Sequence, residues 1–138
     1  MTSASILVVD DEQRQREIYN DILQDEGYAT ETAPSGEVAL HLLSHRRFDL
    51  VITDLNLTGM TGIELLSEIV GEDPAVAVIL ITGYPSIQSA VEATRRGVYQ
   101  YLEKPVDRDE LLRVVAEVLT AWRPSSEPFW VTHPQRRP

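Results

Sequence analysis

The sequence predicts an α/β protein with a doubly wound parallel sheet of five strands, built from strand–helix units over residues 5–122. Short β-branched apolar runs alternate with segments whose apolar residues recur at helical spacing, which is typical of βα units. Glycine ends the first and the fourth helical segments, at Gly27 and Gly97, where a helix end favours it. A chain of 138 residues is long enough for one such domain with a full core.

The strands are expected at residues 5–10, 28–33, 48–54, 75–82 and 98–103. The first helix is expected at residues 12–26, the second from Ser35 as its N-cap, and the third around residues 63–70. The fourth is expected from Pro85 and Ser86 to Gly97, and the fifth from a capping box of Asp107 and Glu110 to residue 122. The apolar positions expected on buried helix faces are Val38, Ala39, Leu42 and Leu43, then Ile63, Leu66, Ile69 and Val70, and finally Leu111, Val115, Val118 and Trp122.

Strand polarity predicts the order of the sheet. The first, third and fourth strands are nearly all apolar, as central strands are, whereas the second and fifth carry Thr30, Glu31, Gln100 and Glu103 and belong at the edges. With right-handed crossovers this favours the order 2-1-3-4-5, which is a flavodoxin-like (βα)5 arrangement.

Polar residues close four of the apolar runs, and these are Asp10, Asp54, Thr82 and Lys104. Parallel strands all point the same way, so these residues should meet at the sheet edge where such folds bind ligands. Asp11 adds a third carboxylate to Asp10 and Asp54, and a hard divalent cation, Mg²⁺ or Mn²⁺, would relieve their repulsion. No histidine or cysteine lies near these motifs, which argues against zinc.

The same residues can support phosphoryl transfer. A carboxylate can act as a nucleophile and form an acyl phosphate, and Asp54 is the candidate. The metal and Lys104 would neutralise the phosphoryl oxygens, while Thr82 and loop N–H groups would donate hydrogen bonds to them.

Residues 5–122 resemble the receiver domains of two-component response regulators. The resemblance is carried by four pieces in order, each at a strand end: Ile6-Leu7-Val8-Val9-Asp10-Asp11-Glu12, Asp49-Leu50-Val51-Ile52-Thr53-Asp54-Leu55, Ile81-Thr82-Gly83 and Tyr101-Leu102-Glu103-Lys104-Pro105. It implies a signalling domain rather than an enzyme: a sensor histidine kinase or phosphotransfer protein would phosphorylate Asp54, and the face of the fourth helix and fifth strand would then change to control an output domain or effector.

The resemblance also implies a role for each site residue. Asp10, Asp11, Asp54 and the Asn56 carbonyl would bind magnesium, with Asp11 and Asp54 as direct carboxylate ligands. Lys104 and Thr82 would contact the phosphoryl group, Thr82 and Tyr101 would form the switch pair, and Lys104–Pro105 would be a cis peptide.

Two positions depart from the family pattern or tune it. Thr58 stands where the family commonly has proline, four residues after Asp54, so the loop is expected to be looser. Tyr84, together with Asn56, should modulate water access and the lifetime of the phosphate. Residues 82–105 look like those of receivers from bacterial enhancer-binding transcription activators, which points to an output in transcription.

Composition restricts the partners. The net charge is −10; residues 123–138 hold three arginines and one glutamate, a balance of +2, so residues 1–122 carry −12. Such an acidic surface disfavours nucleic-acid binding. The chain has no cysteine, no apolar run long enough to cross a membrane and no signal-peptide pattern, so a cytoplasmic location is expected.

Alternatives remain open at this level. A magnesium-dependent phosphatase with an aspartate nucleophile, of the haloacid dehalogenase type, would use similar carboxylates. A phosphorylation-independent interaction module would be expected to have lost Asp54 or Lys104, and neither is lost. A phosphorylation-dependent homodimer is common in the resembled family. Residues 123–138 are interpreted as a disordered tail, a linker stub or an artificial end of the chain.

Overall fold

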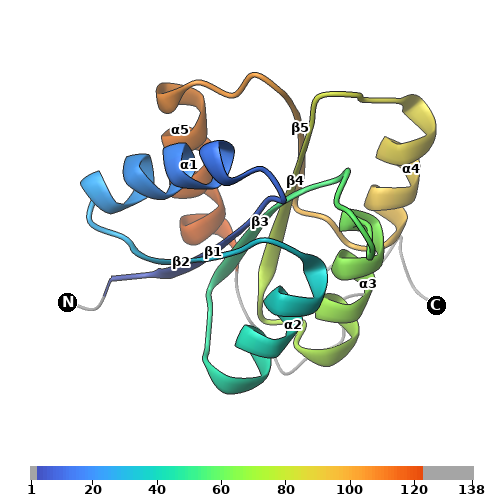
Figure 1. The fold of residues 1–138 in the computed structure, drawn as a ribbon, viewed down its shortest axis with the longest axis horizontal. Helices are drawn as coiled ribbons and strands as arrows, with labels where there is room; N and C mark the ends of the chain where they lie inside the picture. Colours follow the sequence, from blue (N-terminus) through green and yellow to red (C-terminus); the bar gives the residue numbers. More distant parts are fainter. Residues whose placement is uncertain (1–2, 123–138) are drawn as a thin grey trace.

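The computed structural model describes residues 3–122, and its core is a five-stranded parallel sheet in the order β2-β1-β3-β4-β5 (Figure 1). The strands are β1 Ser5–Val9, β2 Ala29–Ala33, β3 Leu50–Asp54, β4 Ala77–Thr82 and β5 Gln100–Glu103. The helices are α1 Gln13–Asp25, α2 Gly36–His45, α3 Gly62–Glu72, α4 Ile87–Arg95 and α5 Arg108–Ala121. The predicted fold class and strand order are therefore confirmed.

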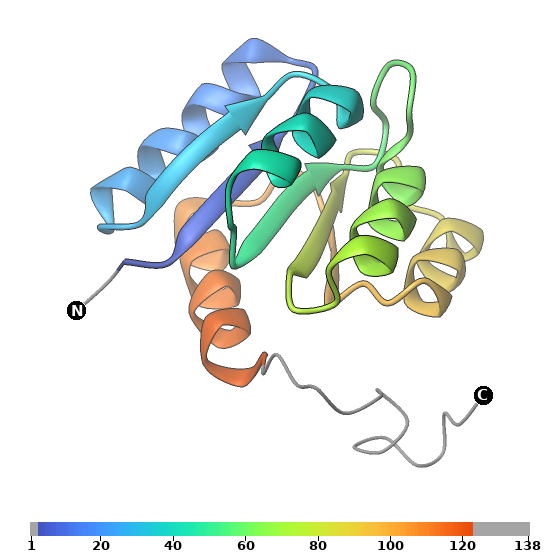
Figure 2. The same cartoon turned by 90° about the horizontal axis from the view of Figure 1, so that it is seen from below.

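The sheet lies between two helical layers. Helices α1 and α5 cover one face, and α2, α3 and α4 cover the other (Figures 1 and 2). Alternate residues of each central strand enter the two layers: Ile6 and Val8 pack with α1 and α5, whereas Leu7 and Val9 pack with α2 and α3. Burial on both faces explains why β1, β3 and β4 read as continuous apolar runs in the sequence.

The predicted helix starts are largely confirmed. Ser35 and Ser86 cap α2 and α4, each accepting a hydrogen bond from the backbone N–H three residues later. The capping box expected at α5 is only half formed, because the Asp107 side chain accepts from the Glu110 N–H but no reciprocal bond is made. A complete box instead begins α3, where Thr61 and Glu64 bond each other's backbone N–H groups.

One expectation about buried helix faces was wrong, and one buried residue was missed. Val38 was expected inside but is 40% exposed, because its position in the first turn of α2 faces outward. Leu65, which the apolar spacing did not single out, is fully buried between α3 and the sheet. Trp122, which directly follows α5, packs against the same core as Leu111, Val115 and Val118, as expected. Its indole Nε1 donates a hydrogen bond of 2.8 Å to the Ala75 carbonyl.

The prediction made for residues 123–138 lies outside the described residues. Across residues 3–122, every helix is too short or too polar to cross a lipid bilayer.

The loop from β3 to α3 is held by a close backbone approach at Gly62. A Cβ at this position would lie 2.4 Å from the Asp54 carbonyl oxygen and 2.7 Å from the Leu55 Cα. The Gly62 N–H also donates to the Leu55 carbonyl at 2.9 Å. Glycine is therefore required here by contact with backbone, which cannot move aside as a flexible side chain would.

We expect Gly62→Ala to lower the free energy of unfolding by about 1–3 kcal/mol, as overpacking does. Gly71→Ala on the same helix is the matched control, because a Cβ there meets no atom within 4 Å. The control should gain about 0.5–1 kcal/mol from helix propensity. Urea unfolding measures both, and equal midpoints for the two variants would contradict the argument.

Candidate functional site

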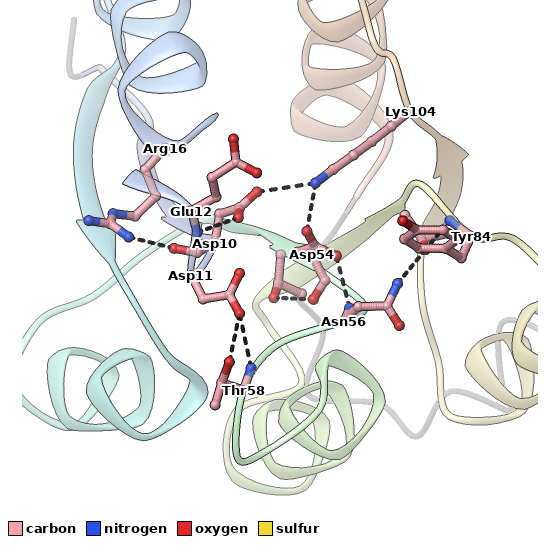
Figure 3. Close-up of polar contacts among 11 residues, drawn as sticks. Asp10, Asp11, Glu12, Arg16, Asp54, Asn56, Thr58, Tyr84 and Lys104 are labelled. Atoms are coloured by element: carbon pink, nitrogen blue, oxygen red, sulfur yellow. Dashed lines mark hydrogen bonds and ion pairs between the residues drawn. The ribbon is translucent and has the colours of Figure 1, made fainter. Parts of the chain in front are cut away.

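The four polar residues predicted at strand ends meet at one edge of the sheet, and Figure 3 shows three of them, Asp10, Asp54 and Lys104. Asp10 directly follows β1, Asp54 ends β3, Thr82 ends β4, and Lys104 directly follows β5. Parallel pairing with β3 between β1 and β4 places these ends side by side. Asp10, Asp54 and Thr82 are buried, so their polar atoms must find partners within the protein.

Lys104 links the two buried carboxylates. Its Nζ lies 2.6 Å from Asp54 Oδ2 and 3.4 Å from Asp10 Oδ2, and its side chain is 21% exposed (Figure 3). Burial alone would lower the pKa of Lys104, but the hydrogen bond to Asp54 and the charges of Asp10 and Asp54 outweigh burial and raise the pKa. The ammonium group is thus held in its charged form between the two carboxylates. Lys104 is also the only lysine of the chain.

Asp10 is the more deeply placed carboxylate. Burial raises its pKa above the usual value, and this outweighs the hydrogen bond from the Glu12 N–H and the charge of Lys104, which act in the opposite direction. The Glu12 N–H donates to Asp10 Oδ1 at 2.9 Å, and Arg16 Nη1 donates to the Asp10 carbonyl at 2.8 Å. These contacts fix the turn after β1, from which Asp11 projects.

Asp11 does not join the other two carboxylates in this arrangement. Its Oδ2 accepts hydrogen bonds from the Thr58 N–H at 3.2 Å and from Thr58 Oγ1 at 2.9 Å (Figure 3). Accordingly, within residues 3–122 no three Asp, Glu or His side chains are gathered as a metal-binding group. The structure thus places Asp11 on Thr58, which offers it two donors, and apart from Asp10 and Asp54. A proline at position 58 would offer neither.

Asn56 connects the Asp54 carboxylate to the Thr82 hydroxyl. The Asn56 N–H donates to Asp54 Oδ1 at 2.8 Å, while its side-chain Nδ2 donates to Thr82 Oγ1 at 2.9 Å. The Tyr84 N–H donates to the same hydroxyl at 3.0 Å. Both acceptor positions of the Thr82 hydroxyl are filled by N–H groups, so its own hydrogen remains available to an acceptor in the site. Tyr84 itself is 82% exposed, at the rim of the site.

Tyr101 lies farther from the carboxylates, on β5. Its ring is partly buried against the α2, α3 and α4 layer, and its hydroxyl lies 2.6 Å from Ser89 Oγ on α4. The sequence singled out Tyr101 but not Ser89, because a serine in a first helical turn is ordinarily a local capping residue. The peptide bond between Lys104 and Pro105 is cis.

This set of groups suits a hard cation and a phosphoryl group. The atoms of the buried site that could bind a metal ion are oxygen atoms of carboxylates, a hydroxyl and backbone carbonyls. These are the ligands that Mg²⁺ prefers. The Lys104 ammonium and the N–H groups around Thr82 supply donors for phosphoryl oxygens. A family comparison agrees with this chemistry: a sequence model of the family described as "Response regulator receiver domain" matches residues 6–116.

The chain belongs to this family. Its relatives include the transcriptional regulatory protein GlrR of Escherichia coli strain K12, which is 38% identical over 127 residues, and the nitrogen assimilation regulatory protein NtrX of Azorhizobium caulinodans, which is 39% identical over 120 residues. The matches cover 92% and 86% of this chain but only 29% and 26% of those proteins. The receiver domain thus corresponds to under a third of each relative's length.

Solved structures resemble the receiver domain throughout its described fold. A CheY-like response regulator receiver domain from Methanospirillum hungatei JF-1 superposes with a TM-score of 0.84 at 32% identity, covering 86% of this chain and 95% of that one. The receiver domain of NtrX from Brucella abortus superposes with a TM-score of 0.80 at 41% identity, covering 84% and 98%.

Proposed function

We propose that this receiver domain is a phosphorylation-activated switch that accepts a phosphoryl group on Asp54. The observation that carries the proposal is the bridge from Lys104 Nζ to Asp54 Oδ2 at 2.6 Å, in a pocket whose other carboxylate, Asp10, is also buried. An ammonium group in this place can neutralise phosphoryl oxygens without leaving the site. The donor is a phosphohistidine of a sensor histidine kinase or of a phosphotransfer protein.

The chemical step balances within this set of groups. An oxygen of the Asp54 carboxylate forms a bond to phosphorus as the bond from phosphorus to the donor imidazole breaks, and the imidazole takes the electron pair. The Lys104 ammonium and the Thr82 hydroxyl donate to the phosphoryl oxygens, and Asn56 holds Asp54 through its N–H. Asn56 and the exposed Tyr84 frame the path by which water reaches the acyl phosphate, which sets its lifetime.

Magnesium is the cation that the donor chemistry fits. Asp10, Asp54 and the Asn56 carbonyl would hold it together with Asp11, once Asp11 turns from Thr58. The bound ion would neutralise charge on the carboxylates and on the transferring phosphoryl group.

The signal leaves the site through Thr82 and Tyr101. When Thr82 moves toward the phosphoryl group, it vacates space that the Tyr101 ring can enter, and the face formed by α4 and β5 changes. That face exposes Ile87 and Val91 on α4, at 86% and 53%. We propose that it controls a transcriptional output carried by an attached domain or an effector, as the names of the relatives suggest, and that it can also pair two phosphorylated copies.

Labelling by a small phosphodonor tests this function. Acetyl phosphate with Mg²⁺ should add one phosphoryl group to the protein, measured as intact mass, and the label should be lost slowly. Steady turnover of general phosphate esters would instead favour the aspartate-nucleophile phosphatase. An interaction module independent of phosphorylation would take no label under any condition.

We expect Asp11→Ala to weaken Mg²⁺ binding at least tenfold, because it removes a carboxylate from the ion's ligands. Isothermal titration of Mg²⁺ measures the affinity directly. Thr58→Val is the matched counterpart: it removes the hydroxyl that holds Asp11 at 2.9 Å, and should strengthen Mg²⁺ binding a few-fold. An unchanged affinity in Asp11→Ala would show that the metal site lies elsewhere.

A further inference from the structure

A cluster of hydroxyl groups joins β5 to the first turn of α4. Tyr101 Oη lies 2.6 Å from Ser89 Oγ, and the Ser86 N–H donates to Tyr101 Oη at 3.4 Å. Ser86 Oγ in turn lies 2.9 Å from Ser89 Oγ and caps the helix by accepting from the Ser89 N–H at 3.0 Å. Ser89 is therefore the point at which the cap of α4 and the Tyr101 hydroxyl meet.

Helix α4 has little apolar burial to hold it. Ala93 is its only fully buried residue, while Ile87 and Val91 are exposed. Since few core contacts fix this helix to the sheet, each polar contact in its first turn carries a larger share of its attachment. The contact between Ser89 and Tyr101 is the shortest of them.

The Tyr101 ring occupies a place from which it can move. It is partly buried against the apolar layer of α2, α3 and α4, beside β4, whose residue Leu80 is its register partner. Thr82, two residues along β4, is at present held by Asn56 and by the Tyr84 N–H. Movement of the ring toward space left by Thr82 would carry its hydroxyl away from α4.

We propose that Ser89 is a positioning residue that latches Tyr101 to helix α4 and thereby opposes the switch; the inference rests on the proposed function. The Ser89–Tyr101 hydrogen bond stabilises the arrangement described here, and the ring must give it up when it moves. A net hydrogen bond of this kind corresponds to about a fivefold change in an equilibrium constant. Loss of the latch should therefore raise the ratio of switched to unswitched domain about fivefold before any phosphorylation.

The test uses the full 138-residue chain and compares Ser89→Ala, Tyr101→Phe and the double variant with the parent. Each single variant removes one side of the Ser89–Tyr101 hydrogen bond; Tyr101→Phe also removes the acceptor of the Ser86 N–H, and Ser89→Ala also removes the contact with Ser86 Oγ. In the parent, the amide NMR chemical shifts of residues 83–103 measured without beryllofluoride define the unswitched state. Those measured with beryllofluoride and Mg²⁺ define the switched state. Without beryllofluoride, the chemical shifts of both single variants should be displaced toward those of the switched state. The displacement in the double variant should be smaller than the sum of the two, because the variants share one hydrogen bond.

Thr94→Ala is the matched control. It also replaces a hydroxyl of α4 by a methyl group and raises helix propensity, but Thr94 Oγ1 bonds only the Ala90 carbonyl within the helix. Its resonances outside the substituted turn should stay at the parent's position. The only phosphorylated residue in Ser89→Ala should still be Asp54, since Ser89 does not contact the site.

Two outcomes overturn the latch while leaving the proposed function intact. In the first, the parent responds to beryllofluoride, but the chemical shifts of Ser89→Ala without beryllofluoride equal those of the unswitched parent. In the second, the chemical-shift displacements of the two single variants add in the double variant. A parent that shows no response to beryllofluoride overturns the proposed function, and the latch with it. Thermal melts of each variant identify any that fails to fold; if Ser89→Ala does, Tyr101→Phe alone decides by the same shifts.

Discussion

Asp54→Asn is expected to abolish phosphoryl labelling of the protein. The substitution keeps the shape of the side chain and its place at the end of β3, but an amide has no nucleophilic carboxylate oxygen. Asp10 is not expected to replace it, because its side chain is less exposed than that of Asp54, 3% against 8%. We expect one added phosphoryl group in the parent and none in the variant.

Intact-mass measurement after treatment with acetyl phosphate and Mg²⁺ provides the test. Asp49→Asn is the matched control. Asp49 directly precedes β3, at the end of the strand opposite to Asp54, and its Oδ2 accepts a hydrogen bond from the Ser5 N–H at 2.8 Å. It should label like the parent. Equal labelling of the parent and Asp54→Asn would place the phosphoacceptor elsewhere and remove the basis of the proposed function.

Lys104→Ala is expected to lower the free energy of unfolding by about 3 kcal/mol, because it leaves two buried carboxylates without their cation. The Asp10 and Asp54 side chains are only 3% and 8% exposed, so water compensates little of that charge. Added Mg²⁺ should restore part of the loss by binding the folded state. Asp54 should still accept a phosphoryl group, at a lower rate, since Lys104 is not the nucleophile.

The same variant should separate labelling from switching. With Lys104 absent, the phosphoryl group loses its contact to the start of the β5–α5 connection, and residues 83–103 should respond only weakly to beryllofluoride. Urea unfolding and amide NMR shifts measure the two effects. Arg113→Ala provides a control for loss of an exposed cation: its ion pair with Glu117 is 60% and 52% exposed and should contribute little. A full response of Lys104→Ala across residues 83–103 would exclude Lys104 as the link.

The sequence alone determined the fold and the membership of the buried site. The apolar runs of β1, β3 and β4 required burial on both faces of the sheet, and the polar residues of β2 and β5 required the two outermost places in it. The strand order followed from these two requirements. Parallel strands have only one edge at which their carboxyl ends meet. Residues at those ends, such as Asp54 and Thr82, were therefore brought together by topology before any side-chain contact was known.

The tertiary structure decided the contacts that depend on where helices and loops sit. The bond from Asp11 to Thr58 spans 47 positions, and that from Asn56 to Thr82 spans 26. No periodicity in the sequence encodes such pairs, because each depends on the direction in which a loop leaves its strand. The exposure of Val38 likewise follows from the rotation of α2 about its axis, which apolar spacing restricts only to within about one residue.

The link between Ser89 and Tyr101 shows most directly why the remainder required the structure. A serine three residues after an N-cap serine and a tyrosine on the next strand each have an ordinary local interpretation. Their hydroxyl groups lie 2.6 Å apart only because the tertiary fold brings the first turn of α4 to β5. The sequence thus determined which residues are buried at the sheet edge, through polarity and strand direction, whereas packing of helices on the sheet decided which of their neighbours bond to them.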